Sequence, residues 1–103
     1  MSQVYISGPV TDSEESKENF AIATKKLLDA GHSVTSSIDA RRILKLRKGR
    51  EPKPEDLSKY CMEKLLDCDS IYYIDTNEKT DLSVLERKVA MNCGIPEIEV
   101  YFV

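Results

Sequence analysis

Short apolar runs alternate along the chain with longer segments of helical spacing. Residues 4–6 form a β-rich run that ends in the turn-forming sequence Ser7-Gly8-Pro9. Apolar residues then recur at three- and four-residue intervals between 20 and 28, which predicts a helix that ends before Gly31. Residues 32–35 predict a second short strand, with a weaker pattern than the first.

The second half of the chain repeats this alternation. Residues 38–46 predict a short helix followed by a loop. Pro54 then begins a helix with apolar residues at i, i+4 and i+8, and residues 71–74 form the unbroken apolar run typical of a strand covered on both faces. A last helix is predicted over 80–92, and residues 98–103 predict a final strand.

Strands separated by helices predict βαβ units and therefore a mostly parallel sheet. We expect a single α/β domain over residues 1–103, Rossmann-like (flavodoxin-like), with four or five strands flanked by helices. In such sheets, ligands bind outside the carboxyl ends of the strands. The loops over 7–12, from 36 onward and over 75–80 meet at that edge, so the candidate site is drawn from them.

Composition restricts the partners of the chain. Apolar residues make up 41% and charged residues 32%, as in an ordinary globular protein. No apolar run approaches the about 20 residues that span a bilayer, and the N-terminus lacks a signal-peptide pattern, so we expect a cytoplasmic protein without a membrane partner. Three cysteines without CxxC spacing and a single histidine predict neither a metal site nor a cofactor.

Basic residues gather in one stretch of an otherwise acidic chain. The net charge is −3, yet seven Lys and Arg residues and only one acid lie between 41 and 53. Proteins that grip duplex nucleic acid are usually basic overall, so we expect no nucleic-acid partner. The local segment suits a small phosphorylated ligand, with Arg41 and Arg42 as candidate contacts; a solvated helix face is the alternative.

Four motifs resemble a known family. The opening Tyr5-Ile6-Ser7-Gly8-Pro9-Val10-Thr11 is similar to the start of small phage and bacterial domains related to nucleoside 2-deoxyribosyltransferases. Further matches follow in the same order, and they cover residues 30–34, 65–71 and 85–96. The similarity extends over nearly the whole chain.

The resemblance implies N-glycosidic chemistry. The family's glutamate on the last helix, which Glu86 matches, attacks the anomeric carbon of a ribosyl group and forms a glycosyl-enzyme. The family's tyrosine on the first strand, which Tyr5 matches, helps to orient that carboxylate and the sugar. The resemblance therefore implies Glu86 and Tyr5 as catalytic residues if the protein is an enzyme.

Helical spacing places Glu86 at the edge of a buried face. Ser83, Glu86 and Ala90 share one stripe of the last helix. The adjacent stripe consists of Leu82, Leu85 and Val89, which we expect to face the core. From the residues alone, a solvated helix acid is the favoured interpretation of Glu86, and the resemblance reverses this preference in favour of a functional carboxylate.

Two classes of function follow. Leu82 stands where the family has glycine, and the chain has no tryptophan, so the departures disfavour turnover more than binding. Some phage proteins similar to this family sequester cyclic ADP-ribose-type immune signals, as in Thoeris anti-defence. We therefore expect a nucleotide-binding protein without turnover, located in the host cytoplasm if it is phage-encoded. The alternative is an N-glycosidic hydrolase or transferase that acts through Glu86.

The predicted ligand-binding set combines the three loops with the last helix. Gly8 permits close approach of the backbone to a ligand, and Asp75 ends the central strand, where it suits a ribose hydroxyl or a base. Because the core is small and the predicted final strand is apolar, we also expect a homodimer or homotetramer. The full set comprises Tyr5, Ser7, Gly8, Pro9, Arg41, Arg42, Asp75, Thr80, Ser83 and Glu86.

Overall fold

Three parallel strands form the centre of the fold, in the order β2-β1-β3. The computed structural model describes residues 2–99. Tyr5 of β1 lies opposite Thr35 of β2 and Ile71 of β3, so β1 is hydrogen-bonded on both edges. The elements follow one another as β1 (Gln3–Ser7), α1 (Glu14–Asp29), β2 (Ser33–Ser36), α2 (Ser37–Lys48), α3 (Pro54–Leu66), β3 (Ser70–Tyr73) and α4 (Asp81–Asn92).

The sheet has fewer strands than the four or five that the sequence predicts. The backbone N–H of Ile71 donates to the carbonyl of Pro96 at 2.9 Å, and the N–H of Ile98 donates to the carbonyl of Ile71 at 2.8 Å. A single parallel bridge joins Ile71 to Glu97. The chain thus begins to pair with the free edge of β3, but Ile98 and Glu99 are not in a strand. The rest of the predicted strand, 100–103, lies outside the described residues.

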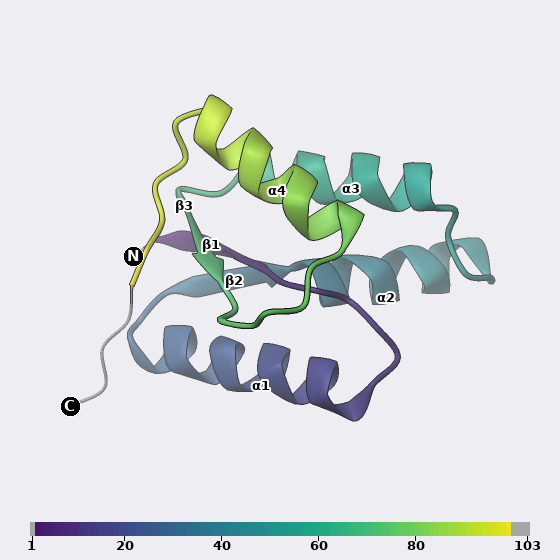
Figure 1. The fold of residues 1–103 in the computed structure, drawn as a ribbon, viewed down its shortest axis with the longest axis horizontal. Helices are drawn as coiled ribbons and strands as arrows, with labels where there is room; N and C mark the ends of the chain where they lie inside the picture. The colour runs from purple at the N-terminus through teal and green to yellow at the C-terminus, as the bar shows by residue number, and fades with distance from the viewer. Residues whose placement is uncertain (1, 100–103) are drawn as a thin grey trace.

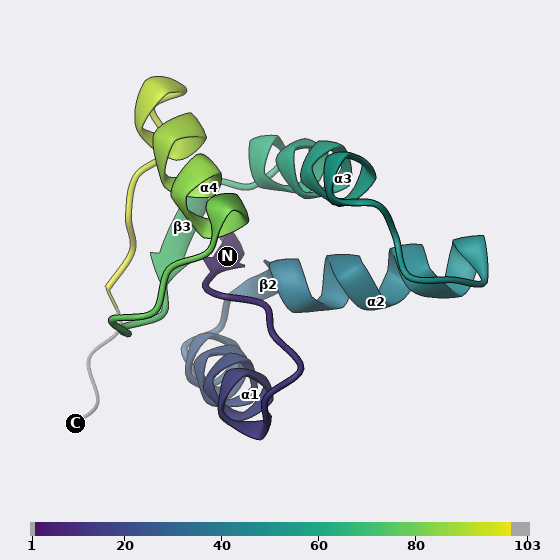
Figure 2. The same ribbon diagram turned by 45° about the vertical axis from the view of Figure 1, so that its right-hand side comes forward.

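Helices cover both faces of the sheet, as Figures 1 and 2 show. Side chains alternate between the faces of a strand, so Val4 and Ile6 of β1 pack on one side against α1. Tyr5 points to the other side, where it joins a core cluster with Ala40 of α2, Cys61 and Leu65 of α3, and Ile71 and Ala90. Successive helices after β1 and β3 therefore leave toward opposite faces.

β2 is followed directly by α2, and Figure 2 shows that α2 extends past the sheet. Ser36 ends β2 and caps α2, because its side chain accepts a hydrogen bond from the N–H of Asp39. Gly49 ends the helix with φ of 70°, a left-handed conformation that glycine adopts without strain. The predicted short helix is confirmed, and its actual span is Ser37–Lys48.

Candidate functional site

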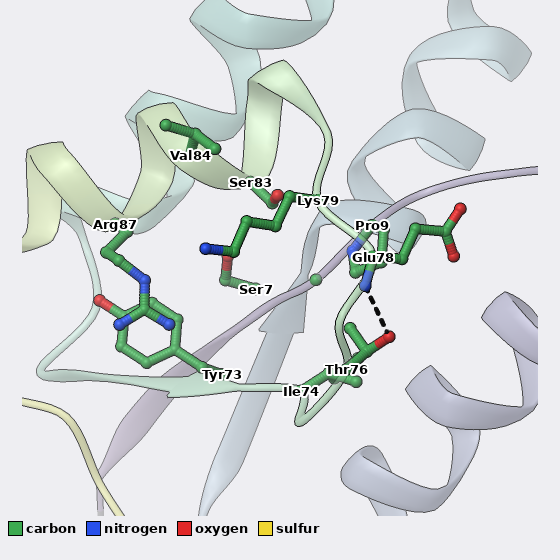
Figure 3. Close-up of a pocket in the computed structure, with 11 residues that line it drawn as sticks. Ser7, Pro9, Tyr73, Ile74, Thr76, Glu78, Lys79, Ser83, Val84 and Arg87 are labelled. Carbon is green, nitrogen blue, oxygen red and sulfur yellow. Dashed lines mark hydrogen bonds between the residues drawn. The ribbon is translucent and has the colours of Figure 1, made fainter.

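A pocket of about 140 Å³ lies where β1 and β3 end side by side. This is the point at which the following helices diverge to opposite faces, and such switch points are the usual ligand sites of open parallel sheets. Figure 3 shows the pocket between the loops after the two strands and the first turns of α4. Its lining consists of Ser7, Gly8, Pro9, Tyr73, Ile74, Thr76, Glu78, Lys79, Ser83, Val84 and Arg87.

Gly8 brings the two loops together. A Cβ at this position would lie 2.8 Å from Cδ1 of Ile74, closer than Cβ atoms come to their neighbours, and 3.1 Å from Cβ of Ile74, a tight contact. The backbone N–H of Ile74 donates to the carbonyl of Ser7 at 2.9 Å, which holds the two strand ends in register. The Ser7-Gly8-Pro9 turn therefore needs glycine for packing.

Glu86 lies directly beneath this pocket and is fully buried. The Tyr5 hydroxyl donates to one carboxyl oxygen, and the Ser7 hydroxyl donates to the other at 2.8 Å. Both donors are on β1, and their side chains face α4 because they alternate with Val4 and Ile6. The alternative interpretation of Glu86 as a solvated helix acid is thus wrong.

Burial dominates the protonation of Glu86. It raises the pKa of this carboxyl from 4.5 to about 7, although the hydrogen bonds from Tyr5 and Ser7 act in the opposite direction. Burial and the neighbouring carboxylate raise the pKa of the Tyr5 phenol, so Tyr5 stays a neutral donor. No ion pair of the described residues includes Glu86. Near neutral pH, Glu86 can therefore hold or release a proton inside the protein.

The upper part of the pocket carries cationic side chains. Lys79 precedes α4, and Arg87 projects from α4 with its guanidinium carbon 3.9 Å from the centroid of the Tyr73 ring. This distance is that of a cation–π contact, which fixes the guanidinium beside the pocket. Figure 3 shows the Lys79 side chain between Ser83 and Ser7, and Arg87 beside the Tyr73 ring. The pocket thus offers positive charge and hydroxyl groups together.

Tyr73, Lys79 and Arg87 also line the pocket, although none of them was predicted as a site residue from the sequence. Their positions in the chain could have indicated the site, because Tyr73 is the last residue of β3 and Arg87 follows Glu86 on α4. Because α4 turns about 100° per residue, Arg87 reaches the pocket rim while Glu86 points inward. Only the packing of α4 on β1 sets this rotation.

The structure brings several of the predicted residues of the first loop and the last helix close together. Ser7, Gly8, Pro9 and Ser83 line the pocket. Tyr5 and Glu86 lie below it without lining it. Thr80 is the N-cap of α4: its side chain accepts from the N–H of Ser83, and the Ser83 hydroxyl accepts in turn from the N–H of Thr80. Thr80 therefore positions Ser83 at the pocket.

The structure does not bring the other three candidates to this pocket. Asp75 lines a separate shallow hollow against α1. Arg41 forms ion pairs with Asp12 at 3.1 Å and Glu51 at 2.5 Å, and it lines an open groove beside α2 together with Arg42. These pairs tie the loop after β1 and the loop after α2 to the helix.

Other basic residues between 41 and 53 also form ion pairs with nearby carboxylates. Lys45 pairs with Glu51 at 3.4 Å, and Lys48 pairs with Asp56 of α3 at 3.5 Å. Arg47 lies over the ring of Tyr60 at 5.6 Å. This segment thus joins α2 to α3.

Neither a metal cluster nor a membrane-spanning helix is found between residues 2 and 99. No three His, Cys, Asp or Glu side chains of that range lie close enough together to hold a metal ion. None of its helices combines the length and the apolarity needed to cross a bilayer.

Fold and site together define a small parallel α/β domain with a buried carboxylate beneath a polar pocket at the carboxyl edge of its sheet. The family described as "Domain of unknown function (DUF4406)" matches residues 2–99, and the chain belongs to this family. No curated protein matches the chain.

Proposed function

We propose that the protein binds a nucleotide-type ligand in the pocket at the ends of β1 and β3 and holds it without turnover. The observation that carries the proposal is the convergence of Lys79, Arg87 and two serine hydroxyls at this edge of the sheet. Positive side chains beside hydroxyl groups suit a phosphate joined to a sugar. The strand order β2-β1-β3 supports the same location, because it begins a flavodoxin-like sheet.

The position of Glu86 favours binding over turnover. A nucleophile has to approach the reacting carbon to about 3–3.5 Å. Glu86 is fully buried, both of its oxygens accept hydrogen bonds from β1, and it does not line the pocket. A ligand in the pocket therefore meets Ser7 before it meets the carboxylate.

The resemblance to deoxyribosyltransferase-like domains narrows the ligand class. We take cyclic ADP-ribose-type immune signals as the first candidates, with sequestration in the manner of Thoeris anti-defence as the role. A pocket of about 140 Å³ accommodates only part of such a ligand. Typical ligand sites occupy about 300–1,000 Å³.

A homodimer or homotetramer would add the missing walls, and exposed apolar side chains support this part of the proposal. Met91 of α4 is 73% exposed and Leu46 of α2 is 75% exposed, while Val84 is both exposed and part of the pocket lining. Apolar groups in such positions favour association between copies. Light scattering tests the oligomer, and a monomer at assay concentration would contradict it.

The alternative function is an N-glycosidic hydrolase or transferase that acts through Glu86. The contact between Tyr5 and Glu86 favours it, because the resemblance implies this pairing of tyrosine and carboxylate. In that mechanism, the Glu86 oxygen forms a bond to the anomeric carbon as the bond to the base breaks, and water then releases the sugar. Ser7 would have to move aside to admit the sugar.

One experiment separates the two functions. The purified protein is incubated with nucleosides, deoxynucleotides and cyclic ADP-ribose isomers, washed and heat-denatured, and the released compounds are identified by chromatography. Intact ligand in proportion to protein is the expected result. Free base in excess over protein would instead establish an enzyme, and recovery of no compound in either form would contradict both functions.

Substitution of Glu86 sharpens the result. Glu86→Gln keeps the size of the side chain and an oxygen that accepts from Ser7. If the protein only binds, Glu86→Gln keeps an affinity for the ligand within about threefold of the wild type. If the protein is an enzyme, the same substitution abolishes the release of free base. Glu63→Gln, at an exposed position of α3, is the matched control.

A further inference from the structure

Ser7 and Ser83 both line the pocket, Ser7 with only 2% of its surface exposed, and both hydroxyls have their hydrogen atoms engaged within the protein. The Ser7 hydroxyl donates to Glu86 at 2.8 Å. The Ser83 hydroxyl donates to the carbonyl of Thr80 at 2.9 Å and accepts from the N–H of Thr80 at 3.0 Å. A hydroxyl has one hydrogen and two lone pairs. Each serine therefore has only acceptor capacity left for a ligand.

When Glu86 is ionised, its burial enforces the direction of the Ser7 hydrogen bond. The Glu86 carboxylate accepts from Tyr5 and Ser7, and it has no exposed surface through which water could replace them. Turning the Ser7 hydrogen toward the pocket would leave one buried carboxylate oxygen without a donor. A buried polar group left unpaired in this way destabilises the protein, and a charged one does so more strongly.

The direction of the Ser83 hydrogen bond follows from the start of α4. Thr80 and Ser83 form a capping box, which satisfies the N–H groups of Thr80 and Ser83 reciprocally. The same geometry leads the Ser83 hydrogen to the Thr80 carbonyl. The two hydroxyls are thus held as acceptors by different elements, β1 and α4.

The cationic groups of the pocket have the opposite character. Lys79 and Arg87 are donors only, so they pair with an anion and cannot serve a ligand hydroxyl as acceptors. Figure 3 shows Lys79 between Ser83 and Ser7, and Arg87 over the Tyr73 ring at one end of the pocket. The pocket therefore presents acceptors and positive charge within one small space.

We infer that the pocket selects ribonucleotides over 2′-deoxyribonucleotides, with Ser7 and Ser83 accepting hydrogen bonds from the ribose diol while Lys79 and Arg87 face the phosphate. This inference rests on the proposed function and adds the sugar to it. A deoxy sugar lacks one of the two donors, so one serine oxygen is left unpaired when the ligand displaces water. Sites that are built to bind a hydroxyl reject the analogue without it by large factors.

The test compares AMP with 2′-deoxy-AMP by titration calorimetry at pH 8.5, where Glu86 is ionised. The wild type is expected to bind AMP at least about tenfold more tightly. In Ser7→Ala or Ser83→Ala that ratio is expected to fall to about twofold or less, because one acceptor is removed. Ser58→Ala, on α3 and away from the pocket lining, keeps the wild-type ratio.

The possible failures are distinguishable. Equal affinity for the two nucleotides in the wild type overturns the inference, and so does a ratio that survives in both serine variants. Each variant is checked by circular dichroism, and Ser83→Ala decides the question if Ser7→Ala does not fold. A wild type that binds neither nucleotide also overturns the inference, and the proposed function is then judged separately by the capture of cyclic ADP-ribose isomers.

Discussion

The buried carboxylate of Glu86 makes the stability of the fold depend on pH in an unusual direction. Its pKa rises from 4.5 to about 7 on folding, so the folded protein binds this proton more tightly than the unfolded chain does. The stabilisation is complete below pH 4.5 and is lost as the pH rises through about 7. Each pKa unit corresponds to about 1.36 kcal/mol, so ionising Glu86 lowers the free energy of unfolding by about 3 kcal/mol.

Most of this change falls between pH 5 and pH 8, where we expect the wild type to lose roughly 2–3 kcal/mol. Other perturbed groups titrate outside that range. The hydrogen bond from Arg41 lowers the pKa of Glu51, and burial raises the pKa of Cys61 to about 12 and that of Cys68 to about 11. For a domain of this size the loss corresponds to a decrease in Tm on the order of 10 °C.

Urea unfolding at pH 5 and pH 8, followed by circular dichroism, measures the effect. Glu86→Gln has no charge to bury, so its free energy of unfolding should change by less than about 0.5 kcal/mol over the same range. The exposed control Glu63→Gln should follow the wild type. If wild type and Glu86→Gln share one pH dependence, the carboxylate is not the group that titrates, and the reasoning from burial is refuted.

Three further predictions concern packing, thiol reactivity and the basic groove. Gly8→Ala should lower the free energy of unfolding by about 1–3 kcal/mol, because its Cβ would lie 2.8 Å from Ile74. Urea unfolding measures this change. Adding Ile74→Val to Gly8→Ala should restore part of the lost stability, because it removes Cδ1. In the native protein, the exposed Cys93 should react with a thiol reagent at pH 8. Cys61 should react only on unfolding, because burial raises its pKa to about 12. A fast phase of the reaction that persists in Cys93→Ser would contradict this. Arg41→Ala should lower the free energy of unfolding by about 1 kcal/mol or less. The amount of captured ligand should stay the same, because Arg41 pairs with Asp12 and Glu51 away from the pocket. A loss of captured ligand would show that the groove belongs to the site.

Local patterns in the sequence were sufficient for most of the fold. The run at residues 4–6, the turn at Gly8 and the helix that Pro54 begins all appear where periodicity and turn chemistry predict them. Parallel pairing follows from the alternation of strands and helices. The described residues form three strands where four or five were predicted, because an apolar run does not by itself reveal whether a neighbouring strand lies beside it.

The rotation of α4 shows what periodicity leaves open. The spacing favoured Leu82, Leu85 and Val89 as the core face, and Leu82 and Val89 do pack against the core, but Leu85 is 37% exposed. The fully buried positions of α4 are Glu86 and Ala90. A polar residue is buried here because Tyr5 and Ser7 supply donors to it from another element.

By itself, then, the sequence determined the local elements, their order and the turn that begins the site, since these depend on residues close together in the chain. The tertiary structure decided which charges meet. Arg41 pairs with Asp12 from another segment and so stays away from the pocket, whereas Arg87 reaches it beside Tyr73. Charge pattern cannot predict such pairings, because an ion pair requires its two groups to lie within about 4 Å, and the packing of distant segments decides which groups come that close.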